Sequence, residues 1–441
     1  MKPSEYNYMI PFGDNILFVN GVSEAFFEVS RLNAGKYRTI MENPDINMEF
    51  YEPFIRKLKS RGFVIEDSVN ERELIECKYK AKRVPHQYYL MVLPTYQCNL
   101  RCWYCTQKHE PLFMEAGTLD KVMRLIERKL NDDAITELHL AWFGGEPLMA
   151  YDTVLELTLF AGDLARSLGK GFSSAITTNG TLLNPERIEA LRMAGINHYQ
   201  ITIDGDKKMH DSIKDLGRIS AYDRTLYNVN LIACHSTVSL RFNYTRDNLR
   251  PFLVFKDLEN RLDPSVRKNI AFTIFKVWQE DDELADDRDV DKLFMSGISS
   301  GMSSTLYTSG VCYADYVNFD CVFPDGKVGK CDNHRPEDAP GILQDDGTVL
   351  WREDMSEYYA PHIFDGLQKV CHSCRYLPLC FGPCVSKRER MLREKGEISC
   401  VYKDREKDMT RNICNMVKTV MQRTPQCQEI SEEGGQHGSE R

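Results

Sequence analysis

Three cysteines lie within eight residues of this chain, in the order Cys-Asn-Leu-Arg-Cys-Trp-Tyr-Cys. Thiolates bind soft metals, and a [4Fe–4S] cluster in a structural role takes four of them. Cys98, Cys102 and Cys105 can bind three irons of such a cluster, which leaves the fourth iron open to another ligand. A metal with an open coordination position can do chemistry. The same spacing also fits half of a zinc site, completed by a distant Cys or His, or three unrelated thiols.

A second motif, Gly-Gly-Glu-Pro, follows further along the chain. Gly144 and Gly145 have no side chain to keep a ligand away from the backbone, and Glu146 supplies a carboxylate that could pair with an ammonium group. On its own this motif is also typical of a plain turn between a strand and a helix.

The composition predicts a globular protein that keeps its thiols free. The chain has 441 residues, an apolar fraction of 42%, 15 cysteines and a net charge of −9. This length predicts two or three domains. The sequence shows no apolar run of about 18 residues and no start typical of a signal peptide, so we expect a cytoplasmic protein without a membrane segment. In a reducing compartment the cysteines are expected to bind metal, and the negative charge argues against a nucleic-acid partner.

The elements that position these motifs can be read from the hydrophobic pattern. Between residues 86 and 300 the chain repeats a strand, a loop and a helix, which predicts a parallel sheet curled into a partial (β/α)6 barrel. The strands are expected at Tyr88–Leu93, Glu137–Trp142, Phe172–Thr177, His198–Ile203, Val238–Phe242 and Ala271–Phe275, and helices at Leu119–Leu130, Pro185–Ala194 and Thr225–Cys234. Both motifs then directly follow a strand, at the edge where barrel enzymes carry their active sites.

The two ends of the chain differ from this middle part. Residues 1–85 predict a small winged-helix-like α+β domain, which ends before Pro85 in a basic run (Lys78, Lys80, Lys82 and Arg83) that is expected to be a solvated linker. Its elements are expected as strands at Tyr6–Ile10 and Asn15–Asn20, a helix from Ser23, a helix at Met48–Ser60, and a strand at Phe63–Ile65. Residues 301–425 are rich in cysteine and poor in periodic segments until a last helix near 403–422, so metal is expected to stabilise them. Residues 426–441 are polar and are expected to be disordered.

Taken together, these motifs resemble those of radical S-adenosylmethionine (SAM) enzymes. The resemblance rests on the CxxxCxxC loop after the first strand, the GGEP motif after the second, and the six-unit partial barrel. It implies that SAM chelates the open iron and is cleaved reductively to a 5′-deoxyadenosyl radical, which removes a hydrogen atom from the substrate. It also implies that Cys98, Cys102 and Cys105 are the cluster ligands. The implied SAM-binding residues are Tyr104, Gly144, Gly145, Glu146, Thr178, Asn179, Asp204 and Lys214, of which Lys214 stands where relatives often carry an arginine.

The later cysteines are similar to the SPASM (twitch-type) extension of these enzymes. That resemblance implies two further [4Fe–4S] clusters, so three in all. Cys312, Cys321, Cys331 and Cys384 would bind the first auxiliary cluster, and Cys371, Cys374, Cys380 and Cys400 would bind the second. Because CxxC pairs also bind zinc, zinc ribbons remain an alternative. Asp332, next to Cys331, resembles the general base of sulfatase-maturing enzymes.

The order of elements in residues 1–85 resembles the leader-recognition (PqqD-like) domain of enzymes that modify ribosomally made peptides. The sequence therefore predicts a peptide maturase that recognises a precursor through its leader and forms an oxidative C–C or thioether cross-link. It also implies an external electron donor of the flavodoxin or ferredoxin type. Two alternatives remain: an anaerobic sulfatase-maturating type of side-chain oxidase, which forms formylglycine, and a non-catalytic scaffold that binds metal and peptide.

Overall fold

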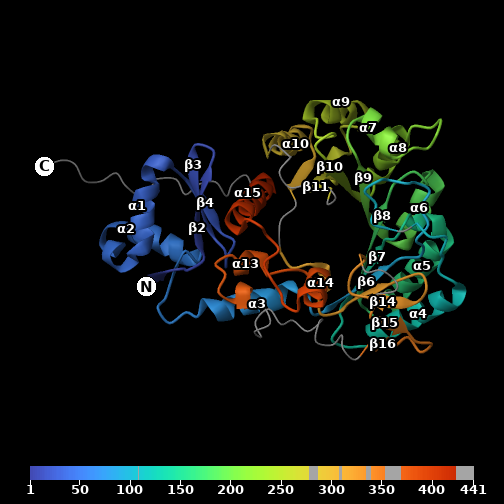
Figure 1. Cartoon of the computed structure of the whole chain (residues 1–441), viewed down its shortest axis with the longest axis horizontal. Coiled ribbons are helices and arrows are strands. Elements are labelled where there is room, and N and C mark those ends of the chain that lie inside the picture. The colour runs from blue at the N-terminus through green and yellow to red at the C-terminus, as the bar shows by residue number, and fades with distance from the viewer. Residues whose placement is uncertain (108, 278–286, 307–309, 334–338, 353–368, 424–441) are drawn as a thin grey trace.

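The computed structural model describes residues 1–107, 109–277, 287–306, 310–333, 339–352 and 369–423. A small N-terminal module lies at one end of the molecule and a large α/β body at the other, with C-terminal helices between them (Figure 1). In the described part of the chain, no helix combines the length and the apolar character needed to cross a membrane. The predicted tail at 426–441 lies outside the described residues.

The large body is built on one sheet of 11 strands, in the order β12-β11-β10-β9-β8-β7-β6-β13-β14-β15-β16. From β12 to β13 all neighbouring strands are parallel, and from β13 to β16 they are antiparallel. The strands are β6 (Gln87–Val92), β7 (Glu137–Trp142), β8 (Gly171–Thr178), β9 (Ile196–Ile203), β10 (Thr237–Tyr244), β11 (Ile270–Lys276), β12 (Ser303–Leu306), β13 (Phe319–Val322), β14 (Lys327–Gly329), β15 (Gly341–Leu343) and β16 (Val349–Trp351). The predicted α/β fold with a partial parallel barrel is confirmed.

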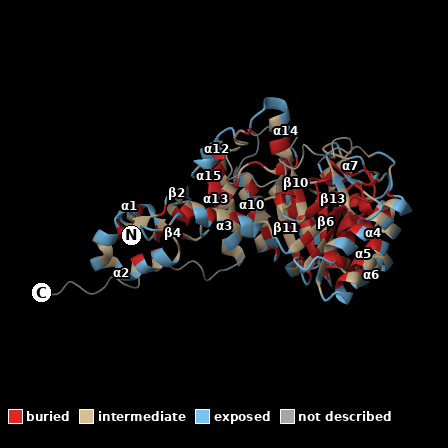
Figure 2. Ribbon diagram, turned by 90° about the horizontal axis from the view of Figure 1, so that it is seen from below, coloured by how far each residue is buried: buried red, intermediate tan, exposed pale blue. Residues whose placement is uncertain are grey.

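Helices cover the outer face of this sheet and enclose the main core with it (Figure 2). They are α4 (Ala116–Leu130), α5 (Tyr151–Ser167), α6 (Pro185–Ala194), α7 (Lys207–Ile213), α8 (Ala221–Ala233), α9 (Pro251–Arg261) and α10 (Asp287–Ser299), with the short 3-10 turns η1 (Pro147–Ala150), η2 (Arg267–Asn269) and η3 (Tyr313–Asp315). The sequence explains their ends well. Before α6 the Asn184 side chain accepts from the Arg187 N–H, and Gly195 ends the helix at φ +106°.

On strands β9 and β10 the inner face of the sheet, opposite to these helices, is polar, whereas around β6, β7 and β13 it carries an apolar cluster that includes Met91, Ala141 and Phe319. Along β9 the residues that face the helices, such as Tyr199 and Ile201, are 0% exposed. The residues between them, Gln200 and Thr202, are partly exposed. Strand β10 follows the same alternation. A closed barrel fills its interior with branched apolar side chains, so the inner face at β9 and β10 is built differently and stays open to polar groups.

The region after residue 300 contains more regular structure than the sequence predicts. Strand β13 pairs in parallel with β6, the first strand of the barrel, and β14 to β16 extend the sheet from there. These strands are four residues or fewer, too short for a periodic pattern to identify them. The C-terminal helices are α12 (Lys369–His372), α13 (Leu377–Cys380), α14 (Val385–Lys395) and α15 (Arg405–Arg423), of which α15 matches the predicted last helix.

The N-terminal module has two more strands and one more helix than predicted. Its elements are β1 (Lys2–Pro3), β2 (Asn7–Phe12), β3 (Asn15–Asn20), β4 (Phe26–Ser30), α1 (Arg31–Glu42), α2 (Pro44–Ser60), β5 (Val64–Ile65) and α3 (Glu71–Lys82). The helix expected from Ser23 is wrong: this stretch forms β4, because Phe27 stacks on Phe18 of β3 at 4.9 Å and packs under the helices.

The basic run before the barrel is not a linker. Lys78 and Lys82 lie on α3, and both ammonium groups bind the Glu24 carboxylate, at 2.9 and 2.8 Å. The charge pattern on its own could not reveal this acceptor, which lies more than 50 residues earlier in the chain.

The N-terminal module packs against the C-terminal cysteine region. Tyr8 of β2 stacks on Tyr376 at 5.4 Å and donates its hydroxyl proton to the Arg375 carbonyl. On α3, Ile75 and Tyr79 belong to the same apolar cluster as Leu377 and Phe381. Two elements of the module therefore hold the segment that carries the CxxC pair Cys371 and Cys374.

Candidate active site at the carboxyl ends of the barrel strands

The cysteine loop after β6 and the Gly-Gly turn after β7 pack against each other through backbone atoms. A Cβ on Gly145 would lie 2.4 Å from the carbonyl oxygens of both Tyr96 and Gln97, and one on Gly144 would lie 2.5 Å from that of Thr95. The Gly145 N–H donates to the Thr95 carbonyl at 3.1 Å. Gly144 and Gly145 therefore allow the backbone of the cysteine loop to pack closely against this turn.

The carboxylate of Glu146 is buried beside this loop, with the residue 1% exposed. It accepts hydrogen bonds from the Thr178 hydroxyl at 2.7 Å, the Asn179 N–H at 2.7 Å and the Leu148 N–H at 3.1 Å. Burial raises its pKa, against the effect of these donors. All three donors are neutral, and the more distant Lys214 ammonium acts by its charge alone, so a cationic ligand such as an ammonium group could still pair directly with Glu146.

The Cys98 thiol of the loop lies near Glu146; Cys98 and Cys102 are partly buried, and Cys105 is exposed. Burial raises the pKa of Cys98 to about 11 and also raises the pKa values of Cys102 and Cys105. The Cys98 sulfur accepts from the Leu100 N–H at 3.4 Å, as thiolate sulfurs of metal sites do. A thiol that resists ionisation alone becomes a thiolate when a metal coordinates it. The chemistry of this donor set therefore fits an iron–sulfur cluster.

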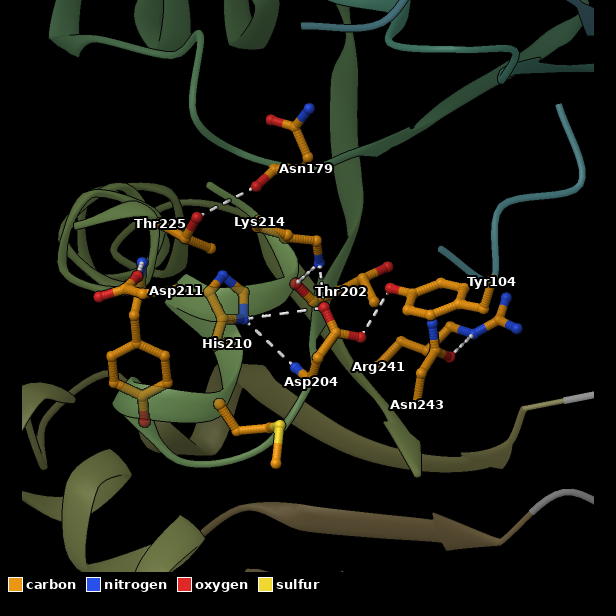
Figure 3. Close-up of polar contacts among 12 residues, drawn as sticks. Tyr104, Asn179, Thr202, Asp204, His210, Asp211, Lys214, Thr225, Arg241 and Asn243 are labelled. Carbon is orange, nitrogen blue, oxygen red and sulfur yellow. Dashed lines mark hydrogen bonds and ion pairs between the residues drawn. The ribbon is translucent and has the colours of Figure 1, made fainter. Parts of the chain in front are cut away.

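The predicted SAM-binding residues Tyr104, Asp204 and Lys214 form one network next to the end of β9 (Figure 3). Asp204, 0% exposed, accepts from the Tyr104 hydroxyl at 2.6 Å and lies 2.8 Å from the Lys214 ammonium. Lys214 also donates to the Thr202 carbonyl at 2.8 Å. Its charge lowers the pKa of Cys102, although burial raises that pKa overall, so Lys214 lies within electrostatic reach of the cysteine loop.

The four cysteines predicted to bind the first auxiliary cluster lie close together. Burial is the main cause of the raised pKa of Cys331, and Cys384 and Cys312 are among the neighbours that raise it further. The pKa of Cys321 is also raised, by burial and by Cys331 among its neighbours. Buried ion pairs connect the segments that carry these cysteines. Arg388, after Cys384, binds Asp315, after Cys312. Lys330, before Cys331, binds Asp320, before Cys321, at 3.0 Å.

The four cysteines predicted to bind the second auxiliary cluster line a single cavity. Cys371, Cys374, Cys380 and Cys400 all face it, together with Tyr376, Tyr402 and Arg405. Burial raises the pKa of Cys371 to about 12, with its three partners as further causes. The described cysteines are all free thiols, and in the described segments no three His, Cys, Asp or Glu side chains are grouped closely enough for a single metal ion.

Asp332 lies against the inner face of the barrel rather than in a solvated loop. It is 9% exposed, and its carboxylate accepts from the Tyr313 hydroxyl. Tyr313 in turn stacks on Tyr89 of β6 at 5.8 Å. A buried carboxylate at this place could accept a proton from a substrate on the inner face.

Sequence reasoning missed several residues of the site. Arg241 and Asn243 lie on β10 in hydrogen-bond contact with each other, and His210 is buried behind Asp204. The first pair belongs to a strand in which polar and apolar residues alternate, and a long charged side chain in that pattern was a signal for Arg241. For Tyr313 no sequence signal exists, because its partner follows 19 residues later in a non-periodic segment.

Comparison with known proteins agrees with this architecture. Residues 92–235 match the model of the Radical SAM superfamily. The PqqA peptide cyclase of Ruegeria pomeroyi is 26% identical over 337 residues, which cover 68% of this chain and 83% of that protein. An AdoMet-dependent heme synthase of Methanosarcina barkeri is 33% identical over 138 residues, 31% of this chain. That match spans 36% of the heme synthase, and a match to a GTP 3′,8-cyclase of Clostridium perfringens spans 41% of the cyclase.

A solved structure with the same fold is that of native anSMEcpe with bound AdoMet and Cp18Cys peptide. It has a TM-score of 0.52 and 18% sequence identity, and the alignment covers 78% of this chain and 98% of that one. The matched superfamily segment begins at the end of β6 and includes the cysteine loop, Glu146 and the Asp204–Lys214 network. This chain therefore carries a radical SAM domain at residues 92–235.

Proposed function

We propose that this protein is a radical SAM peptide maturase that joins side chains of a ribosomally made precursor peptide by an oxidative C–C or thioether bond. The observation that carries the proposal is the convergence of three features on the inner face of one barrel: the Cys98 loop with buried Glu146, the Asp204–Lys214 network, and Asp332 beside the first auxiliary cysteines. The match to a peptide cyclase over 83% of its length supports a peptide substrate.

A cluster on Cys98, Cys102 and Cys105, with SAM bound to it, would supply a 5′-deoxyadenosyl radical that removes a hydrogen atom from the peptide. The residues of the chain would bind SAM and orient it. Glu146 would bind the methionine ammonium group, since it is a buried carboxylate with neutral donors. Lys214 supplies a positive charge near Cys102, suited to the methionine carboxylate, and Tyr104 and Asp204 offer polar atoms to the ribose.

Joining two side chains removes two hydrogens from the peptide. One leaves as an atom and the other as a proton and an electron. Asp332 is our candidate for the proton acceptor, since it is a buried carboxylate on the inner face. The electron would pass to [4Fe–4S] clusters held by the two sets of four cysteines, whose full ligation suits electron transfer. An external flavodoxin- or ferredoxin-type protein would supply the electron for SAM cleavage.

We further propose that the chain is divided as 1–85, 86–300, 301–425 and 426–441, and that the first of these domains binds the leader of the precursor in the cytoplasm. The module offers two edge strands, β2 and β4, each with one neighbour in its three-stranded sheet among the described residues. An extended peptide can add to such an edge by backbone hydrogen bonds. Basic residues on α2 would suit an acidic leader, but two of them are already paired within the module, since Arg56 binds Glu52 and Lys59 binds Glu66.

The proposal is tested first on the cofactor. Anaerobically reconstituted protein should hold about 12 iron and about 12 sulfide per chain if three [4Fe–4S] clusters form. Reduced protein given SAM should release 5′-deoxyadenosine, and Cys102→Ala should abolish this product. Cys77→Ala removes an exposed thiol as a matched control and should leave it unchanged. Zinc without sulfide, or product from Cys102→Ala, would contradict the proposed centre.

The second test concerns the peptide. Short reading frames beside the gene provide candidate precursors, and the product of the matching one should lose two hydrogens per modification and yield a cross-linked pair on digestion. An aldehyde that reacts with hydrazine would instead identify a formylglycine-forming oxidase. Binding of a precursor without any SAM cleavage would identify a scaffold.

A further inference from the structure

A single arginine on the inner face of the barrel is held with its terminal N–H groups unused. Arg241 lies on β10, in register with Thr202 of β9 and Thr273 of β11. Its Nε–H donates to the Asn243 side-chain oxygen at 2.9 Å, and its guanidinium carbon lies 4.1 Å from the centroid of the Phe275 ring. Among the described residues the terminal nitrogens of Arg241 have no protein acceptor, yet they are not among the buried polar atoms that lack a partner. These nitrogens therefore remain accessible.

The orientation of the Arg241 guanidinium is fixed in the way that favours binding of a carboxylate. The stacked ring fixes the plane of the guanidinium, and Asn243 fixes its rotation about the side-chain axis. An arginine whose fork is fixed in advance loses little side-chain entropy when it binds a carboxylate through two parallel hydrogen bonds. Figure 3 shows the Arg241 guanidinium pointing away from the Asp204 carboxylate, so its two terminal nitrogens are not turned toward that carboxylate.

The position of Arg241 separates it from the part of the site that suits the SAM methionine group. That part is formed by Glu146 and the cysteine loop, and Lys214 already supplies a positive charge there. Through its charge Arg241 interacts with Tyr104 and Asp204, on the side of the predicted ribose contacts, and with Asp332 and Tyr313, on the β13–β14 side of the sheet. Five strands separate β10 from β14 in the sheet order, so these groups face one another across the curled inner face. A ligand bound to Arg241 is thereby placed toward Asp332.

We infer that Arg241 is a substrate-binding residue that takes a side-chain carboxylate of the peptide, from Asp or Glu, and so orients the peptide toward Asp332. This inference rests on the proposed peptide substrate. The same chemistry could come from the carboxylate of SAM, and the experiment must separate the two sources.

The test is a binding measurement that needs no turnover. The probes are the tripeptides acetyl-Ala-Glu-Ala-amide and acetyl-Ala-Gln-Ala-amide, titrated by calorimetry into the reconstituted full-length protein with SAM bound. The wild type should prefer the glutamate peptide about tenfold, which corresponds to about 1.4 kcal/mol. Arg241→Gln should remove the preference, and Arg241→Lys should keep part of it. Arg250→Gln removes an exposed arginine a few residues further on and should keep all of it.

SAM affinity, measured by equilibrium dialysis on the same proteins, distinguishes the sources of the carboxylate. It should be the same in Arg241→Gln as in the wild type. A tenfold loss of SAM affinity with the peptide preference intact would assign Arg241 to SAM and overturn the inference. Equal affinity of the wild type for both peptides, including binding of neither, would overturn it too. Failure of the proposed function is a different result, since it would appear as a wild type that releases no 5′-deoxyadenosine.

Discussion

His210 provides a pH-dependent test of how the SAM-binding region is held. The imidazole lies on α7, is 0% exposed and accepts the Asp204 N–H at Nδ1 over 3.2 Å. Its proton is therefore on Nε2, which has no hydrogen-bond partner among the described residues. Burial, assisted by the Lys214 ammonium and opposed by the Asp204 carboxylate, lowers the pKa of His210 to about 3.

The direction in which stability changes with pH follows from the unfolded state, where the pKa of a histidine is about 6.5. Between about pH 6.5 and pH 3 the unfolded chain binds a proton at His210 that the folded chain does not bind, so stability falls as the pH falls through this window. Above about pH 6.5 both states are neutral at this residue and its contribution is fully present. The loss of unfolding free energy approaches about 1.4 kcal/mol per pH unit. Between pH 7 and pH 5.5 this loss amounts to about 1.2 kcal/mol.

Two assays check this prediction. In urea denaturation, the wild type should lose about 1.2 kcal/mol more between pH 7 and pH 5.5 than His210→Asn, whose amide oxygen can replace Nδ1 as acceptor but does not titrate. The variant can be less stable at every pH, so the comparison uses the slope and not the level. Histidine-selective ¹⁵N NMR should show the Nε2-protonated tautomer throughout this range. A His210 signal that titrates near pH 6.5, or equal slopes for the two proteins, would refute the reasoning.

Three further changes test the packing around the predicted clusters. Gly145→Ala should cost about 1–3 kcal/mol of unfolding free energy, because its Cβ would overlap backbone oxygens, whereas Gly117→Ala, with open space around it, should be neutral or stabilising in thermal denaturation. Arg388→Met should lower the free energy of unfolding by about 3–5 kcal/mol, because it leaves Asp315 buried without its partner. Adding Asp315→Leu to this variant should restore part of the lost stability, and no recovery would contradict the ion-pair assignment. Deleting residues 1–83 should increase binding of a hydrophobic dye and lower the iron content, because Tyr376 and its neighbours lose their cover; unchanged dye binding would count against that contact.

The parts of the fold with a strong local pattern could be predicted from the sequence. Strand β7 and helix α6 begin and end where the sequence predicts, since β7 alternates between apolar and polar residues and α6 has Asn184 and Gly195 at its ends. The strand at Phe26–Ser30 was missed because two aromatic residues followed by Glu and Val fit a helix as well as a strand. Pairing with β3 decides between them, and that contact is not local.

The candidate site divides in the same way. The thiols and Glu146 could be found because residue type and spacing identify them. Lys214 was expected as a SAM-binding residue only through the family resemblance, and its ion pair with Asp204 depends on the path of the chain after β9. Arg241 shows in the sequence only as part of the alternation of β10, and Tyr313 meets Asp332 in a segment without a periodic pattern, so neither could be assigned to the site from spacing.

The two sets of auxiliary cysteines are positioned by different physical means, and this bears on their roles. Around the first set, buried ion pairs connect the segments that carry the cysteines, and one segment lies on β13, which is part of the barrel sheet. The second set is held by apolar and aromatic contacts, several of them from the N-terminal module through Tyr8, Ile75 and Tyr79. A leader bound to this module would therefore act on packing next to the second set, while the first set keeps its place relative to Asp332 and Arg241. Under the proposed function, the first set would exchange electrons with a substrate on the inner face, and the second set would respond to the leader.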